Sequence, residues 1–114
     1  MTDFASQIEF LKQHSSYAQR WLNSRPEWLE WLQSQSAFKV DIAGIRGLLT
    51  PCQDALVVPE QNEAQFMADL RLARQRLMLW IAFRDLNGMA DLSEVTHALS
   101  HFAEEVVALS IAYV

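Results

Sequence analysis

The chain has 114 residues, of which 51% are hydrophobic and 20% are charged, and it contains only three glycines and three prolines. This length and composition predict a single domain over residues 1–114 with one hydrophobic core, and the shortage of helix breakers favours helix. The formal net charge of −5 excludes a protein that attracts nucleic acid or anionic lipid through its overall charge. Any anion site must therefore be local.

Cys52 is the single cysteine, which excludes an intrachain disulfide and favours a reducing compartment, the cytoplasm. The segment around it, TPCQD, is irregular enough to leave the thiol exposed, but no neighbour in sequence would activate it. The first residues, MTDFASQIEF, lack the pattern of a targeting signal. No uncharged apolar run approaches the roughly 20 residues that cross a bilayer, so we expect no membrane segment.

The first part of the chain predicts two helices. Residues 3–23 carry apolar side chains at helical spacing, which predicts one amphipathic helix. Its apolar positions are Phe4, Ile8, Leu11, Ala18 and Leu22, with Tyr17 and Trp21 widening the stripe. A short helix over residues 25–34 follows, with Ser24 as its predicted cap, Pro26 in its first turn and Glu27 completing a capping box.

Residues 35–61 form the irregular part, because glycines and prolines interrupt the pattern and allow only a short helix over 41–49. The pattern then predicts a long helix over residues 60–87, ending at Asn87-Gly88, a typical left-handed stop. The sequence therefore predicts an all-α fold, a small helical bundle or array of about four to five helices.

Residues 92–114 predict the last helix, with Asp91 as its cap and Glu94 as the capping-box partner. Its apolar face is predicted to hold Val95, Leu99, Phe102, Val106, Leu109 and Tyr113. The helix carries none of the usual C-terminal stop signals, so we expect the chain to be a fragment of a longer polypeptide.

The long helix contains LRLARQRLMLWIAFRDL, residues 70–86, in which four arginines lie among apolar residues. Apolar residues fall on two sides of this helix, which predicts packing between neighbours on both. One side holds Leu72, Leu79, Phe83 and Leu86, and the other holds Phe66, Leu70, Ala73, Leu77 and Ile81. Arg71 and Arg74 fall on the remaining stripe, where a solvated edge or a contact with a partner is expected.

Arg84 points in the direction of Phe66 and Leu77, so its stem must pass through the packed layer and its charge needs a partner. We expect Arg76 and Arg84 to stack on Trp80, four residues from each, in a structural role. A carboxylate from another helix would complete the cluster, and the candidates are Glu27, Glu30 and Glu94. Binding of an external phosphate or an acidic partner surface is the alternative.

Two other groups of residues invite a functional interpretation. Glu94, His97, His101 and Glu105 lie at spacings that would let their side chains share a metal ion, but no second Glu-x-x-His exists, so a solvated face is favoured. Trp21, Trp28 and Trp31 could form a binding platform, although a place in the core is commoner for tryptophan.

Catalytic motifs are absent from the sequence, which lacks G-x-x-x-x-G-K-[ST], G-x-S-x-G, H-E-x-x-H and a D-x-D pair. We therefore predict no catalytic, cofactor-binding or metal-binding residue in this chain. A stand-alone helical adaptor that binds protein through its tryptophan-rich face is one interpretation of such a sequence.

Two segments carry a family resemblance: RPEWLEWL, residues 25–32, and LRLARQRLMLWIAFRDLNGMADLSEVTHALSHFAEEVVALS, residues 70–110. In order and spacing they resemble the N-terminal region of the bifunctional glutamine synthetase adenylyltransferase/adenylyl-removing enzyme. The resemblance is strong over residues 68–109 and absent over 34–61, and Trp80 replaces a basic residue expected there.

The resemblance implies a large parent enzyme in which nucleotidyltransferase domains add AMP to glutamine synthetase and remove it, with ATP and Mg²⁺, under control of glutamine and the PII signal protein. The motifs that hold the metal in the family, G-x-G-K-x-G-G and S-D-x-D, do not occur in these 114 residues. The resemblance therefore implies a helical flank of the adenylyl-removing domain, inactive alone, that helps to present glutamine synthetase. Arg71 and Arg74 are the charges expected to face that substrate or the downstream domain.

Overall fold

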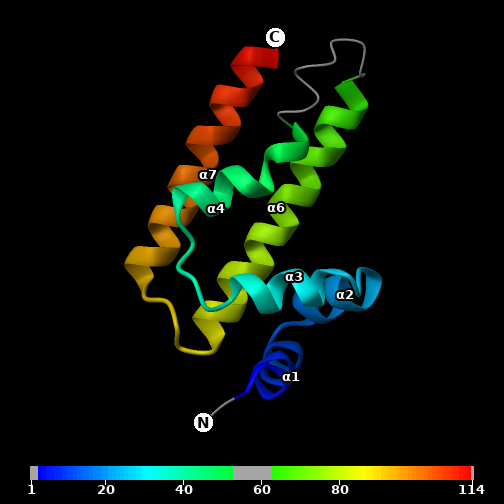
Figure 1. Ribbon diagram of the computed structural model, residues 1–114, viewed down its shortest axis with the longest axis vertical. Helices are drawn as coiled ribbons and strands as arrows, with labels where there is room; N and C mark the ends of the chain where they lie inside the picture. Colours follow the sequence, from blue (N-terminus) through cyan, green and yellow to red (C-terminus); the bar gives the residue numbers. More distant parts are fainter. Residues whose placement is uncertain (1–2, 53–62, 114) are drawn as a thin grey trace.

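A computed structural model describes residues 3–52 and 63–113 of the chain. These residues form helices and contain no strand, which confirms the all-α prediction (Figure 1). The helices are α1 Phe4–His14, α2 Ser16–Ser24, α3 Trp28–Gln35, α4 Ile42–Leu48, α6 Glu63–Leu86 and α7 Leu92–Tyr113. Among them, none is long and apolar enough to cross a membrane.

Helix α6 forms the centre of the fold. Helices α1, α3, α4 and α7 all contact it, and α7 returns beside it after a tight turn, while α4 crosses both long helices (Figure 1). The core residues of α6 include Phe66, Ala73, Leu77, Leu79, Trp80, Ile81 and Phe83, with Leu70, Leu72 and Leu86 partly buried. Burial on both sides confirms that α6 packs between neighbours.

The single helix predicted over residues 3–23 is wrong, because the chain breaks at Ser15. Ser15 has extended backbone angles, φ −143° and ψ 102°, and its hydroxyl accepts a hydrogen bond from the N–H of Ala18 at 3.1 Å. It therefore ends α1 and caps α2. Leu11 and Leu22 nevertheless both reach the core, so the hydrophobic pattern continues across the break.

The predicted capping of α3 is also wrong. Ser24 is the last residue of α2, and α3 begins at Trp28, where Glu27 makes no side-chain capping bond. The N–H of Trp28 instead donates to the carbonyl of Arg25 at 3.0 Å, so a backbone turn starts this helix. The short helix predicted over 25–34 does exist.

The predicted stop of the long helix is confirmed. Gly88 adopts φ +71°, the left-handed conformation that glycine tolerates best. The N–H of Met89 donates to the carbonyl of Arg84 at 2.7 Å, and the N–H of Gly88 donates to Asp85 at 3.1 Å. These two bonds form a Schellman motif, which ends α6 and turns the chain toward α7. Residues 60–62 of the predicted helix lie outside the described residues.

Helix α4 matches the short helix predicted over 41–49, and Asp41 caps it by accepting the N–H of Gly44 at 2.8 Å. Helix α7 packs through most of its predicted apolar face, but the buried strip is shifted toward Ala98. Ala98 and Leu109 are buried, whereas Leu99, placed on the predicted apolar face, is 44% exposed. Val95, Phe102 and Val106 are partly buried, and the side chain of Tyr113 lies outside the described part.

Candidate functional site

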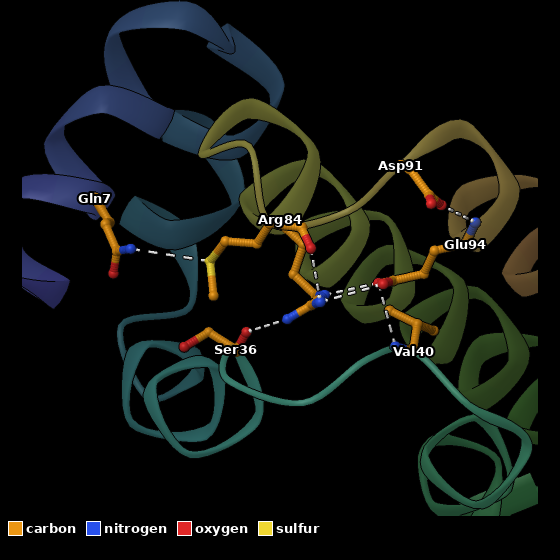
Figure 2. Close-up of polar contacts among 7 residues, drawn as sticks. Gln7, Ser36, Val40, Arg84, Asp91 and Glu94 are labelled. Carbon is orange, nitrogen blue, oxygen red and sulfur yellow. Dashed lines mark hydrogen bonds and ion pairs between the residues drawn. The ribbon is translucent and has the colours of Figure 1, made fainter. Parts of the chain in front are cut away.

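Arg84 is the most buried charged side chain described, with 4% of its surface exposed. Its Nε donates to Oε2 of Glu94 at 2.7 Å and its Nη2 donates to Oε1 at 3.1 Å, a two-point ion pair (Figure 2). The remaining bonds go to backbone carbonyls: Nη1 donates to Ser36 and Nη2 to Met89, both at 2.9 Å. One guanidinium thus joins α6, α7, the end of α3 and the turn after α6.

Glu94 does not form the predicted capping box. Asp91 caps α7 as expected, since its carboxylate accepts the N–H of Glu94 at 2.8 Å. The Glu94 carboxylate, however, turns inward to Arg84 and also accepts the N–H of Val40 at 3.4 Å (Figure 2). Its side chain is only 9% exposed, so the ion pair with Arg84 takes the place of a local cap.

The Arg84 cluster has the geometry of a structural element. The Nε and Nη2 atoms, which would grip an external phosphate or carboxylate, already hold Glu94. Of the three carboxylates proposed as partners, Glu94 is the one that pairs with Arg84. In the described residues Arg84 makes no stack with Trp80, so that part of the prediction is wrong.

Arg76 lies over Trp31 and not over Trp80 as predicted, with its Cζ 4.4 Å from the centroid of the Trp31 ring. Trp31 in turn meets Trp80 edge to face, with the ring centroids 6.3 Å apart. Helix α3 therefore inserts an aromatic ring between the two α6 residues that sequence spacing had paired. Burial lowers the pKa of the Arg76 guanidinium.

Arg71 and Arg74 are exposed on α6, as expected for its solvated stripe. Neither forms an ion pair with a side chain in the described ranges 3–52 and 63–113. Arg74 lies near α2, because its charge tends to lower the pKa of Tyr17, against the larger rise that burial causes. These two arginines are free to meet another surface.

The four residues considered for a metal do not gather. Glu94 pairs with Arg84, and Glu105 pairs with Arg46 of α4 through two guanidinium nitrogens, both at 3.1 Å from Oε1. His97 and His101 lie with ring centroids 6.2 Å apart. Within the described residues, no three histidine, cysteine, aspartate or glutamate side chains gather so that they could hold a metal ion.

The tryptophans serve mainly in packing. Trp21 and Trp28 stack at 5.5 Å between ring centroids, Trp28 is buried, and Trp21 and Trp31 pack partly buried against the core. Cys52 is fully buried, so an exposed thiol is wrong. Burial, reinforced by the charge of Asp69, raises the pKa of that thiol to about 11.

Sequence reasoning missed the backbone partners of the Arg84–Glu94 pair. The carbonyls of Ser36 and Met89 and the N–H of Val40 have no signature in the sequence, because every residue except proline offers the same groups. It also missed the pair between Arg46 and Glu105, which are 59 residues apart. Charge complementarity alone could have suggested that pair, but many pairings satisfy it equally.

Comparison with known proteins decides the family. Residues 5–114 match the family described as glutamate-ammonia ligase adenylyltransferase. The chain belongs to this family.

Relatives in the glutamate-ammonia ligase adenylyltransferase family carry the name bifunctional glutamine synthetase adenylyltransferase/adenylyl-removing enzyme. The protein of Ralstonia nicotianae is 33% identical over 107 residues, which cover 94% of this chain and 11% of the relative. That of Thioalkalivibrio sulfidiphilus is 47% identical over 60 residues, 53% of this chain and 6% of the relative. That of Bordetella pertussis is 32% identical over 103 residues, 87% of this chain and 10% of the relative.

Two of these relatives align with most of this chain, and the chain spans only about a tenth of their length. No solved structure matches it. The family match confirms the resemblance seen in RPEWLEWL and in the arginine helix. The matched residues include Arg84 and Glu94.

Proposed function

We propose that this chain is the N-terminal helical part of a cytoplasmic enzyme that adds AMP to glutamine synthetase and removes it, next to the adenylyl-removing domain. The observation that carries the proposal is the family match over residues 5–114. The names of the relatives support both reactions. ATP, Mg²⁺ and the PII signal protein would act on the rest of such an enzyme.

Within that enzyme we assign the chain a structural and substrate-presenting role. The buried Arg84 engages Glu94 and two backbone carbonyls, so it is not available to a nucleotide. Among the described residues, no three histidine, cysteine, aspartate or glutamate side chains could together hold a metal ion. Transfer of a nucleotidyl group depends on metal ions that neutralise its charge, so catalysis would take place in another domain.

Arg71 and Arg74 would face glutamine synthetase or the downstream domain. Both lie exposed on α6, three residues apart and so on one side of the helix. In an acidic chain with a formal charge of −5 they form a local positive site, which favours an acidic patch on the partner.

The test uses an enzyme that contains this chain together with its nucleotidyltransferase domains, assayed for phosphorolysis of adenylylated glutamine synthetase. We expect the double variant Arg71→Glu/Arg74→Glu to raise KM for glutamine synthetase about tenfold with little change in kcat. Reversing two charges at the contact surface weakens association of the substrate without touching the reacting groups. Arg20→Glu reverses an exposed charge on α2 and is the matched control. Wild-type KM in the double variant would contradict the assignment.

A second assay tests the absence of catalysis in the chain itself. The purified 114-residue protein should transfer no AMP to glutamine synthetase in the presence of ATP and Mg²⁺, and should remove none from adenylylated glutamine synthetase in the presence of inorganic phosphate and Mg²⁺. Turnover above background that copurifies with the folded chain would contradict the structural role. A gene that stops at codon 114, with no nucleotidyltransferase domain beyond it, would instead favour a stand-alone adaptor.

A further inference from the structure

His97 and His101 lie one turn apart on α7 and line the same groove. The groove has a volume of about 670 Å³ and runs between the first turns of α7 and residues 39–43, at the start of α4. The two imidazole rings lie with their centroids 6.2 Å apart and their planes 24° apart. Residues four positions apart share one side of a helix, so both rings reach the same open space.

The two glutamates considered with these histidines are already engaged. Glu94 is held by Arg84. Glu105 is held by Arg46. Neither carboxylate is therefore free for a metal ion, which is why the site of four residues does not form. The two histidines differ, because in the described part of the chain their contacts use Nδ1 and leave Nε2 of each ring without a hydrogen bond.

Each imidazole has an oxygen beside its Nδ1. The hydroxyl oxygen of Ser93 lies 3.3 Å from Nδ1 of His97. The Oε2 atom of Glu104 lies 3.8 Å from Nδ1 of His101. A histidine that binds a metal through one nitrogen almost always donates the N–H of the other to an oxygen, which fixes the tautomer. With the proton on Nδ1, the lone pair on Nε2 is available to a metal ion.

The charges around the groove favour a cation. Asp41 and Asp91 both line it, and each uses one carboxylate oxygen, Oδ1, to cap a helix. Lys39 is the positively charged side chain among the lining residues. The two capping carboxylates therefore outweigh one ammonium group, and the resulting negative potential attracts a divalent ion toward the imidazoles.

We propose that His97 and His101 bind a divalent transition-metal ion, such as Zn²⁺, through Nε2 of each ring, with water in the remaining positions. Imidazole nitrogen suits such ions, and two histidines four residues apart on a helix are a known zinc-binding arrangement. Both side chains are at least partly exposed, so the rings can turn toward one ion. The inference stands independently of the proposed function.

The experiment adds ZnCl₂ to the ¹⁵N-labelled 114-residue chain and follows the ring nitrogens of its three histidines by NMR. The Nε2 resonances of His97 and His101 should shift saturably and with one binding constant. His14 is an internal control, because its ring lies against Phe10 on α1, and it should not shift over the same range. MgCl₂ should shift none of the three, because Mg²⁺ prefers oxygen ligands.

Variants test whether the two imidazoles act together. His97→Ala and His101→Ala should each weaken binding of Zn²⁺ at least about tenfold, because one of two linked ligands is lost. Thr96→His/His97→Ala keeps three histidines but places two of them five residues apart, on different sides of α7, so it should bind as weakly as the single variants. His14→Ala should bind Zn²⁺ like the wild type.

The NMR spectrum of each variant reports whether it folds, and the His14 and MgCl₂ controls need only the wild-type chain. The proposal is overturned if ZnCl₂ shifts His14 as strongly as His97 and His101, or if MgCl₂ causes the same shifts, which would indicate a carboxylate site. It is equally overturned if a folded single variant, or the folded variant with the rearranged pair, binds Zn²⁺ as the wild type does.

Discussion

The carboxylate of Glu94 holds Arg84 through two hydrogen bonds, at 2.7 and 3.1 Å, across the turn that joins α6 to α7. Both side chains are nearly excluded from solvent, with 5% and 9% exposed. Arg84 also reaches the carbonyl of Ser36, 48 residues earlier in the chain. Arg84 therefore links the two long helices through its ion pair with Glu94 and attaches the end of α3 to them through the carbonyl of Ser36.

Replacing Arg84 with alanine should destabilise the fold by about 3–5 kcal/mol, because the Glu94 carboxylate is left buried without its partner. Urea denaturation followed by tryptophan fluorescence measures this loss. Arg71→Ala, on the exposed stripe of the same helix, should change the free energy of unfolding by no more than about 0.5 kcal/mol. An Arg84→Ala variant as stable as Arg71→Ala would show that the ion pair is not structural.

The two glycines of α4 should respond in opposite directions to alanine. At Gly44 a Cβ would lie 2.5 Å from Cη2 and 2.8 Å from Cζ3 of Trp80, so Gly44→Ala should cost about 1–3 kcal/mol through overpacking. At Gly47 a Cβ meets nothing within 4 Å, so Gly47→Ala should stabilise by about 0.5–1 kcal/mol through helix propensity. Thermal melting of both variants checks the sign of each change. Equal effects would contradict the close packing of α4 on Trp80.

The turn after α6 should depend on the left-handed conformation of Gly88. Its φ of +71° is costly for a residue with a Cβ, so Gly88→Ala should destabilise by about 1–2 kcal/mol. Gly88→Asn should cost less, since asparagine tolerates this conformation better. Chemical denaturation of the two variants gives the order, and a neutral Gly88→Ala would contradict the Schellman turn.

Cys52 should be unreactive in the folded chain, because its thiol is buried and its pKa is raised to about 11. At pH 8 a thiol-specific reagent should modify it only as fast as the chain opens, and urea should release the reaction. Rapid modification at the rate of a free thiol would contradict the burial.

The raised pKa of Cys52 also predicts a pH dependence. Between about pH 9 and pH 11 the unfolded chain loses the thiol proton while the folded chain keeps it, so the free energy of unfolding falls as pH rises. The Cys52→Ala variant lacks this contribution, so its stability relative to the wild type should improve across that range. Parallel pH profiles for the two proteins would exclude the effect.

Much of the fold follows from local physics. The two-sided apolar pattern of residues 63–86 required a helix packed between neighbours, and Arg84 lay on one of those sides, so its burial and its need for a carboxylate were predictable. The Asn87-Gly88 dipeptide predicted where α6 ends. These predictions depended only on helical geometry and on the backbone preference of glycine.

Other features depend on contacts distant in sequence. The break at Ser15 has no glycine or proline to mark it, and the apolar pattern continues through it because both helices pack on the same core. The buried face of α7 runs through Glu94, Ala98, Glu105 and Leu109, with two carboxylates that look solvated until Arg84 and Arg46 are placed opposite them. Trp31 reached Arg76 from α3, which spacing along α6 could not reveal.

The most direct test of the structural role of Arg84 is a double-mutant cycle with Arg84→Met and Glu94→Leu, measured by urea denaturation. If the buried pair joins α6 to α7, each single variant loses stability and the double variant recovers part of it, with a coupling energy of about 2–3 kcal/mol. Additive losses, with a coupling energy below about 0.5 kcal/mol, would contradict the account.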